Sequence, residues 1–152
     1  MQRRDEPLCD LEAPSRDPHG IFVLIEAPLS IFAGCLSGKV SEEQLQKIGA
    51  KKVELNEIFR SADFITLHTP LTNETKGILN KKTMLECKKG VRIINCARGG
   101  LIVENDLIEL LDNDHIAGAA LDVFDEEPPK NNNLFKSENL ILTPHLGAST
   151  TE

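Results

Sequence analysis

The chain has no tryptophan and no tyrosine, and aromatic residues make up only 4% of its 152 residues. It also lacks any apolar run near the roughly 20 residues that a membrane-spanning helix needs. The longest candidate, residues 21–25, is followed at once by Glu26 and Pro28. Two arginines stand near the N-terminus, but no apolar signal core follows them directly, so we predict no export signal. We therefore expect a cytoplasmic protein with no membrane partner.

Metal-ligand clusters and basic stripes are missing as well. The four cysteines form no Cys-x-x-Cys pair and the histidines do not cluster, which argues against a zinc site and a disulfide framework. The formal net charge of −7 repels phosphate backbones, and no stripe of lysine and arginine interleaves with aromatic residues. We expect no metal and no nucleic-acid partner, although small anions can still bind locally.

The composition, 40% apolar and 27% charged, suits one compact domain with a real core. The N-terminal and C-terminal parts of the chain differ in how regular their sequence pattern is. Four prolines and scattered charges break up residues 1–39, which stay unassigned, and these residues contain no G-x-G-x-x-G phosphate-binding turn. From Ser41 onward the pattern is regular.

Strands and helices alternate along this second part. The patterns predict helices at 41–49, 56–62, 81–87 and 105–111, and strands at 52–55, 63–68, 91–94, 116–124 and 140–143. A further strand is expected at 21–25. Alternation at this spacing indicates an α/β fold with a parallel sheet of βαβ units.

The segment Asn95-Cys96-Ala97-Arg98-Gly99-Gly100 is the centre of the pattern. An apolar strand leads into it and a polar, capped helix follows it. The carboxyl ends of the strands in an open α/β sheet face the ligand crevice, so Arg98 is placed where small anions bind. Taken alone, an Arg-Gly-Gly turn is just as compatible with a solvated loop.

Two further strand ends carry complementary polar groups. Glu127 follows the strand at 116–124, and His145 follows the strand at 140–143. In a parallel sheet both ends lie along the edge that holds Arg98. An arginine can bind a carboxylate through two parallel hydrogen bonds, and a histidine beside a carboxylate can hold a proton near neutral pH. Each residue by itself would more simply be an ordinary loop residue.

Four long segments give the pattern a family. The chain from about Ser41 resembles the NAD-binding domain of the D-isomer-specific 2-hydroxyacid dehydrogenases, and among them the phosphoglycerate dehydrogenases. The segments that carry the resemblance are Asp63-Phe64-Ile65-Thr66-Leu67-His68-Thr69-Pro70-Leu71-Thr72 with Glu74-Thr75-Lys76-Gly77, Asn95-Cys96-Ala97-Arg98-Gly99-Gly100, Ala119-Ala120-Leu121-Asp122-Val123-Phe124 with Glu126-Glu127-Pro128, and Thr143-Pro144-His145-Leu146-Gly147-Ala148-Ser149-Thr150.

The resemblance implies a role for individual residues. Arg98 would bind the substrate carboxylate and polarise the carbonyl, His145 would be the acid/base, and Glu127 would set the charge of His145. The implied cofactor is NAD and the implied substrate a small 2-hydroxy or 2-keto acid. Residues expected to line the cofactor are Thr69, Cys96, Ala97, Arg98, Asp122, His145, Gly147 and Ala148, with no metal involved.

The chain departs from the family before the region that matches. The expected fold is therefore Rossmann-like but incomplete at the N-terminus, with residues 1–39 unassigned, residues 40–152 forming the C-terminal part of the NAD-binding domain, and no substrate domain. The family's glycine loop binds the pyrophosphate and its second domain closes the site, and we recognise neither in this sequence. We therefore expect a fragment with little or no turnover by itself.

Two alternative functions stay open. One is a glyoxylate or hydroxypyruvate reductase of the same family, and the other is a dinucleotide-sensing interaction protein, like the corepressors built on this fold. The resemblance also implies a homodimer.

Overall fold

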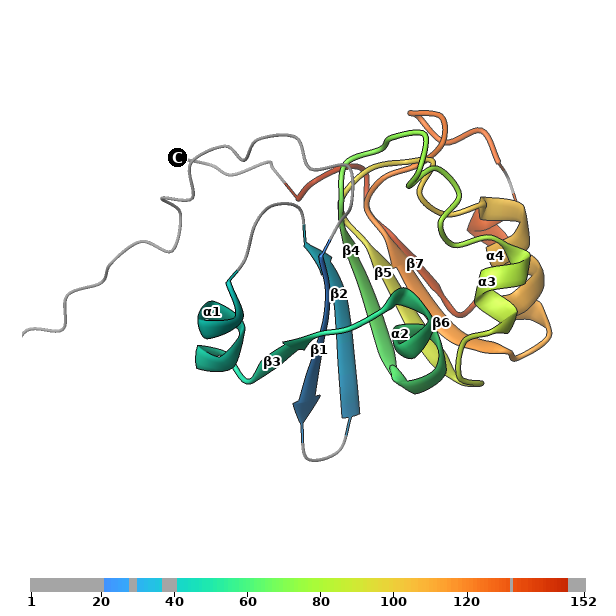
Figure 1. Cartoon of the computed structure of the whole chain (residues 1–152). Coiled ribbons are helices and arrows are strands. Elements are labelled where there is room, and N and C mark those ends of the chain that lie inside the picture. Colours follow the sequence, from blue (N-terminus) through green and yellow to red (C-terminus); the bar gives the residue numbers. More distant parts are fainter. Residues whose placement is uncertain (1–20, 28–29, 37–40, 132, 148–152) are drawn as a thin grey trace, which may run out of the picture.

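The computed structural model describes residues 21–27, 30–36, 41–131 and 133–147 (Figure 1). Within these residues the elements in chain order are β1 (Ile21–Ala27), β2 (Ser30–Leu36), α1 (Glu42–Lys47), β3 (Ala50–Lys52), α2 (Leu55–Ser61), β4 (Phe64–His68), α3 (Lys81–Leu85), β5 (Val91–Asn95), α4 (Glu104–Asp112), β6 (Ile116–Leu121), the short 3₁₀ helix η1 (Leu134–Lys136) and β7 (Leu140–Leu142). In the described part of the chain, no helix has the length and apolar character needed to cross a membrane.

All described strands join one sheet, in the order β3-β1-β2-β4-β5-β6-β7. From β2 to β7 each neighbouring pair is parallel. Helices flank the sheet, with α3 in the crossover from β4 to β5 and α4 in the crossover from β5 to β6 (Figure 1). The α/β class and the Rossmann-like parallel sheet predicted from the sequence are confirmed.

The N-terminal strands differ from the simple pattern. The strand expected at 21–25 lies inside β1, but β2 was not predicted. β1 pairs antiparallel with both β2 and β3. Only residues 28 and 29 separate β1 from β2, and two strands joined so closely must run antiparallel, because a parallel crossover needs a dozen or more residues.

Helix ends are fixed by the capping residues of the sequence. Ser41 caps α1 with the predicted capping box, in which its hydroxyl accepts from the amide of Gln44 and the Gln44 side chain accepts from the amide of Ser41. Gly49 follows the helix with a φ of 70°, which glycine adopts at little cost.

The edge strand expected at 52–55 lies slightly earlier, as β3 at Ala50–Lys52, because Leu55 already begins α2.

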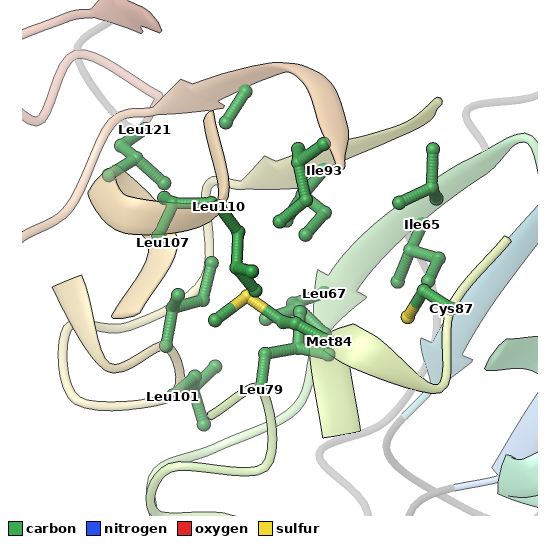
Figure 2. Packing of buried hydrophobic residues seen from close by; sticks show 14 of the residues in the cluster. Ile65, Leu67, Leu79, Met84, Cys87, Ile93, Leu101, Leu107, Leu110 and Leu121 are labelled. Atoms are coloured by element: carbon green, nitrogen blue, oxygen red, sulfur yellow. The ribbon is translucent and has the colours of Figure 1, made fainter. Parts of the chain in front are cut away.

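The core lies between the sheet and helices α2, α3 and α4. Figure 2 shows Met84 of α3 and Leu107 of α4 packed among Ile65, Ile93 and Leu121 from three successive strands. Each of these side chains is at most 4% exposed. Removing apolar surface from water contributes about 25 cal/mol for each Å², so these buried side chains stabilise the parallel strands. The carboxyl ends of β4 to β7 are thereby fixed beside one another.

Candidate active site

The turn after β5 is held by Asn95, the last residue of that strand. The Asn95 side-chain Nδ2 donates to the carbonyl of Arg98 at 2.9 Å, and its Oδ1 accepts from the amide of Ala97 at 3.1 Å. Asn95 is buried, so both ends of its amide are used inside the protein. The backbone that carries Arg98 is therefore set by its own strand end.

Gly99 brings this turn against the segment after β6. A Cβ atom on Gly99 would lie 1.8 Å from the carbonyl oxygen of Phe124, so only glycine fits there. The next residue, Gly100, has a φ of 79°, which also favours glycine. The glycine pair expected to redirect the chain therefore has two distinct tasks, a close approach and a left-handed turn.

The guanidinium of Arg98 is exposed at this edge. Its Nη1 donates to the carbonyl of Ala97 at 2.6 Å. No carboxylate of the described residues lies within ion-pair distance of Arg98, and neither Glu127 nor His145 forms a hydrogen bond with its head group. The structure thus places Arg98 at the predicted edge but leaves its charge available to a ligand.

Glu127 and His145 form a direct pair. Nδ1 of His145 and Oε2 of Glu127 are 2.8 Å apart. The other Glu127 oxygen accepts from the amide of Phe124 at 3.3 Å. The bond to His145 is the main cause that lowers the pKa of the Glu127 carboxyl from its ordinary value, and the Phe124 amide adds to it. Two strand ends that lie 18 residues apart in the chain are thus joined by one hydrogen bond.

Asp122 fixes the backbone on which His145 stands. Its carboxylate accepts from the hydroxyl of Thr143, from the amide of Leu146 at 2.8 Å and from the amide of Gly147 at 2.7 Å. These bonds, that of Thr143 first, lower the pKa of the Asp122 carboxyl. His145 has a φ of 54°, rare for a residue with a side chain. The turn is held in that conformation from both sides.

The remaining predicted residues lie on the same edge in different degrees of exposure. Thr69 directly follows β4 and is buried, whereas Cys96 is exposed and Ala97 is half-buried. Gly147 closes the His145 turn and is exposed. Ala148 lies outside the described residues.

The arrangement fits a nicotinamide cofactor in one testable respect. A carboxylate has about four acceptor positions, and Asp122 uses three of them on the His145 turn. The fourth, on the oxygen bound by Gly147, could accept from a carboxamide N–H. Among the described residues, no three histidine, cysteine, aspartate or glutamate side chains are grouped as metal ligands.

Two residues that position this edge carried no sequence prediction of a role. One is Asn95, described above. The other is Glu104, a buried residue of α4 whose Oε1 accepts from the amide of Asp125 at 2.8 Å and so anchors the segment that leads to Glu127. Burial raises the pKa of the Glu104 carboxyl, partly offset by that amide. In the sequence Glu104 looks like any acidic residue at a helix start.

Comparison with known proteins identifies the family. Residues 33–147 match the model of the family described as "D-isomer specific 2-hydroxyacid dehydrogenase, NAD binding domain". The chain belongs to this family. The chain is 58% identical over 113 residues to D-3-phosphoglycerate dehydrogenase of Bacillus subtilis strain 168, a match that covers 74% of this chain and 22% of the relative. It thus spans about a fifth of the length of such curated relatives.

Solved structures of the family have the same fold. A D-isomer specific 2-hydroxyacid dehydrogenase from Xanthobacter autotrophicus Py2, in complex with NADPH and MES, is 38% identical with a TM-score of 0.58, over 60% of this chain and 30% of that one. A glyoxylate reductase from Paecilomyes thermophila is 34% identical with a TM-score of 0.68, over 74% of this chain and 34% of that one.

Proposed function

We propose that this chain carries the NAD-binding and proton-transferring part of an oxidoreductase that acts on the CH–OH group of a D-2-hydroxy acid. The observation that carries the proposal is the 2.8 Å contact between His145 Nδ1 and Glu127 Oε2 at the carboxyl edge of the sheet. An acid/base pair at this edge, in a chain of this family, fits a reaction that moves a proton together with a hydride.

In this proposal His145 transfers the proton through its second ring nitrogen. In the described part of the chain, Nδ1 is bonded to Glu127 and no hydrogen bond engages Nε2. Because Glu127 engages Nδ1, Nε2 is the ring nitrogen left to donate to a carbonyl oxygen during reduction and to accept from a hydroxyl during oxidation. When bound, the nicotinamide supplies or accepts the hydride.

Arg98 is proposed to bind the substrate carboxylate. A guanidinium offers paired donors to a carboxylate, and this one has no acidic partner among the described residues. Thr69, Cys96, Ala97, Asp122 and the 145–148 turn are proposed to contact the cofactor. A homodimer is proposed on the family resemblance. A cytoplasmic location is proposed as well.

We propose the 3-phosphoglycerate dehydrogenase type of reaction, because the Bacillus subtilis relative at 58% identity bears that name. The alternative is reduction of glyoxylate or hydroxypyruvate, which is supported by the similarity to the glyoxylate reductase structure at 34% identity. The higher identity favours the phosphorylated substrate.

The test is a pair of measurements on the purified chain. Quenching or enhancement of NADH fluorescence on titration measures cofactor binding. Loss of reduced-cofactor absorbance with 3-phosphohydroxypyruvate, hydroxypyruvate or glyoxylate measures turnover. The proposal expects saturable NADH binding and the highest kcat/KM, whatever its absolute size, with the phosphorylated acid.

Three results would argue otherwise. An absence of saturable binding at millimolar NADH contradicts the proposal, and preference for glyoxylate favours the reductase alternative. Binding that changes the mass in solution without any turnover favours a dinucleotide-sensing protein.

A further inference from the structure

Thr143 follows the last strand of the sheet, at a point where strand pairing ends. β7 has only three residues and lies at one end of the described strand order. The last pair in its register is Leu142 opposite Leu121 of β6. His145 comes after this last pair, so bonds other than strand pairing have to hold it in place.

Three hydrogen bonds of Thr143 connect β6 to the turn that carries His145. Its amide donates to the carbonyl of Leu121 at 3.0 Å, and its carbonyl accepts from the amide of His145 at 3.0 Å. Its hydroxyl donates to Oδ1 of Asp122, the residue that directly follows β6. Thr143 thus bonds to the neighbouring strand, to the carboxylate that supports the turn and to the backbone of His145.

The hydroxyl of Thr143 helps to fix the orientation of the Asp122 carboxylate. Oδ1 of Asp122 accepts from both that hydroxyl and the amide of Leu146, and Oδ2 accepts from the amide of Gly147 at 2.7 Å. A Cβ on Gly147 would lie 2.9 Å from Oδ2, so the carboxylate lies directly against a residue without a side chain. Without the hydroxyl, one of the described donors remains on each oxygen, and the carboxylate is held less firmly.

The turn needs this support because of the backbone of His145. Its φ of 54° lies in the left-handed region, which a residue with a side chain rarely adopts. Such a conformation persists only where surrounding contacts hold it. Relaxation to an ordinary negative φ would redirect the imidazole, whose Nδ1 now lies 2.8 Å from Oε2 of Glu127. The contact between His145 and Glu127 therefore depends on the turn.

We propose that Thr143 is a positioning residue for the His145–Glu127 pair. Its hydroxyl fixes the Asp122 carboxylate, the carboxylate holds the turn of His145, and the turn keeps the imidazole on Glu127. Among the described residues Thr143 forms no hydrogen bond with Glu127, so it acts on the pair only through Asp122 and the turn. As far as it concerns turnover, the inference rests on the proposed function and adds a residue to the same site.

Two carboxyl groups report on the two ends of this series of bonds. The hydrogen bond from Thr143 is the main cause that lowers the pKa of the Asp122 carboxyl. The bond to His145 is the main cause that lowers the pKa of the Glu127 carboxyl. The first pKa therefore reports the bond that Thr143 makes itself, and the second reports the pair that it is proposed to position.

The experiment follows both carboxyl groups by ¹³C NMR as the pH is lowered, with Asp122→Asn and Glu127→Gln to assign the signals. In Thr143→Val the pKa of Asp122 should rise toward its ordinary value of 3.8, and that of Glu127 toward 4.5. Thr143→Ala, which removes the hydroxyl without adding any group, should do the same. Thr143→Ser keeps the hydroxyl, so both pKa values should stay as in the wild type.

Thr66→Val is the matched control. Thr66 lies in β4, and its hydroxyl is 2.9 Å from Nε2 of His68, a histidine outside the proposed acid/base pair. Both carboxyl pKa values should stay unchanged in this variant. A wild-type pKa of Glu127 in folded Thr143→Val or Thr143→Ala would overturn the inference. An equal rise in Thr66→Val or in Thr143→Ser would overturn it as well.

Turnover separates this inference from the proposed function. With NADH and 3-phosphohydroxypyruvate at high protein concentration, Thr143→Val should lower kcat by about 10- to 100-fold and leave KM within about twofold, because Arg98 is proposed to bind the substrate. A raised pKa of Glu127 with an unchanged kcat would overturn the role of Thr143 in the reaction.

The two failures look different. If the wild type shows no turnover but the pKa values change as expected, the proposed function fails and Thr143 still positions the pair. If the wild type turns over and the pKa of Glu127 ignores Thr143, the function stands and this inference fails.

Discussion

The two sides of the proposed site are organised differently. On one side, His145 is bonded to Glu127, and Asp122 holds the turn on which it stands. On the other, the backbone of Arg98 is fixed by Asn95, but its guanidinium bonds only to the carbonyl of Ala97 among the described residues. The comparison teaches that the side proposed to transfer the proton is held by bonds within the protein, whereas the guanidinium proposed to bind an anion has few such bonds.

The largest expected effect on stability comes from the contact that joins the two sides. Gly99→Ala places a Cβ 1.8 Å from the Phe124 carbonyl, so the turn after β5 must separate from the segment after β6. We expect a loss of at least about 1–3 kcal/mol in the free energy of unfolding, measured with urea. Gly118→Ala, whose Cβ would lie 3.3 Å from the Asn139 carbonyl, is the matched control and should cost less. Equal losses would contradict the close approach.

The assembled side should reveal itself through pH. The pKa of Glu127 is lowered, chiefly by its bond to His145, so the stabilisation is complete above the ordinary carboxyl pKa of 4.5 and is lost as the pH falls through the lowered value. Glu127→Gln cannot ionise. The difference in Tm between wild type and this variant should therefore be greatest near neutral pH and shrink in acid. A difference that does not vary with pH would show that ionised Glu127 does not contribute to stability.

The open side should be chemically accessible. Cys96 is exposed in the turn before Arg98, whereas Cys87 is buried, which raises the pKa of its thiol to about 12. Because the thiolate is the reactive form, iodoacetamide should label Cys96 well before Cys87, as read by peptide mass spectrometry. NADH should slow the labelling of Cys96. No protection at saturating NADH would remove Cys96 from the cofactor site.

The smallest effect is expected at Glu104, which accepts a hydrogen bond from the Asp125 amide in the segment that leads to Glu127. Burial raises the pKa of its carboxyl, so its contribution to stability is full below the ordinary value of 4.5 and is lost as the pH rises through the raised value. Glu104→Gln keeps an acceptor for the Asp125 amide and carries no charge. We expect its Tm to match wild type in acid and to equal or exceed it at neutral pH, by differential scanning calorimetry. A marked loss at neutral pH would show that the charge itself is needed.

The sequence could predict much of the sheet because the relevant signals are local. Apolar, β-branched runs bounded by turn residues located β4, β5 and β7, and the rule that parallel strands end at one edge placed Glu127 and His145 on neighbouring strand ends. The structure then shows these two side chains in contact. Their catalytic roles stay predictions.

Other features depend on the folded chain and left no local signal. β2 is a strand only because it pairs with β1 and β4, and its sequence, with a glycine and a cysteine in the middle, lacks clear alternation. The two hydrogen bonds of the Asn95 side chain form only once the turn after β5 has folded. A hollow of about 460 Å³ beside the Arg98 turn likewise exists only because residues of three separate segments, around Lys76, Arg98 and Asp125, meet there. Of the three predicted head groups, Arg98 alone forms no hydrogen bond with the others among the described residues.

The most direct test of the account replaces each of two histidines, one at the end of β4 and one in the turn after β7. His145→Asn removes the proposed acid/base, and His68→Asn changes an exposed histidine at the end of β4 that bonds to Thr66. At high protein concentration, with NADH and 3-phosphohydroxypyruvate, the account predicts that the low turnover expected of this chain falls by about 10²–10⁴-fold, to background, in His145→Asn and falls far less in His68→Asn. Equal rates in the wild type and the His145→Asn variant, with both proteins folded and binding NADH, would contradict it.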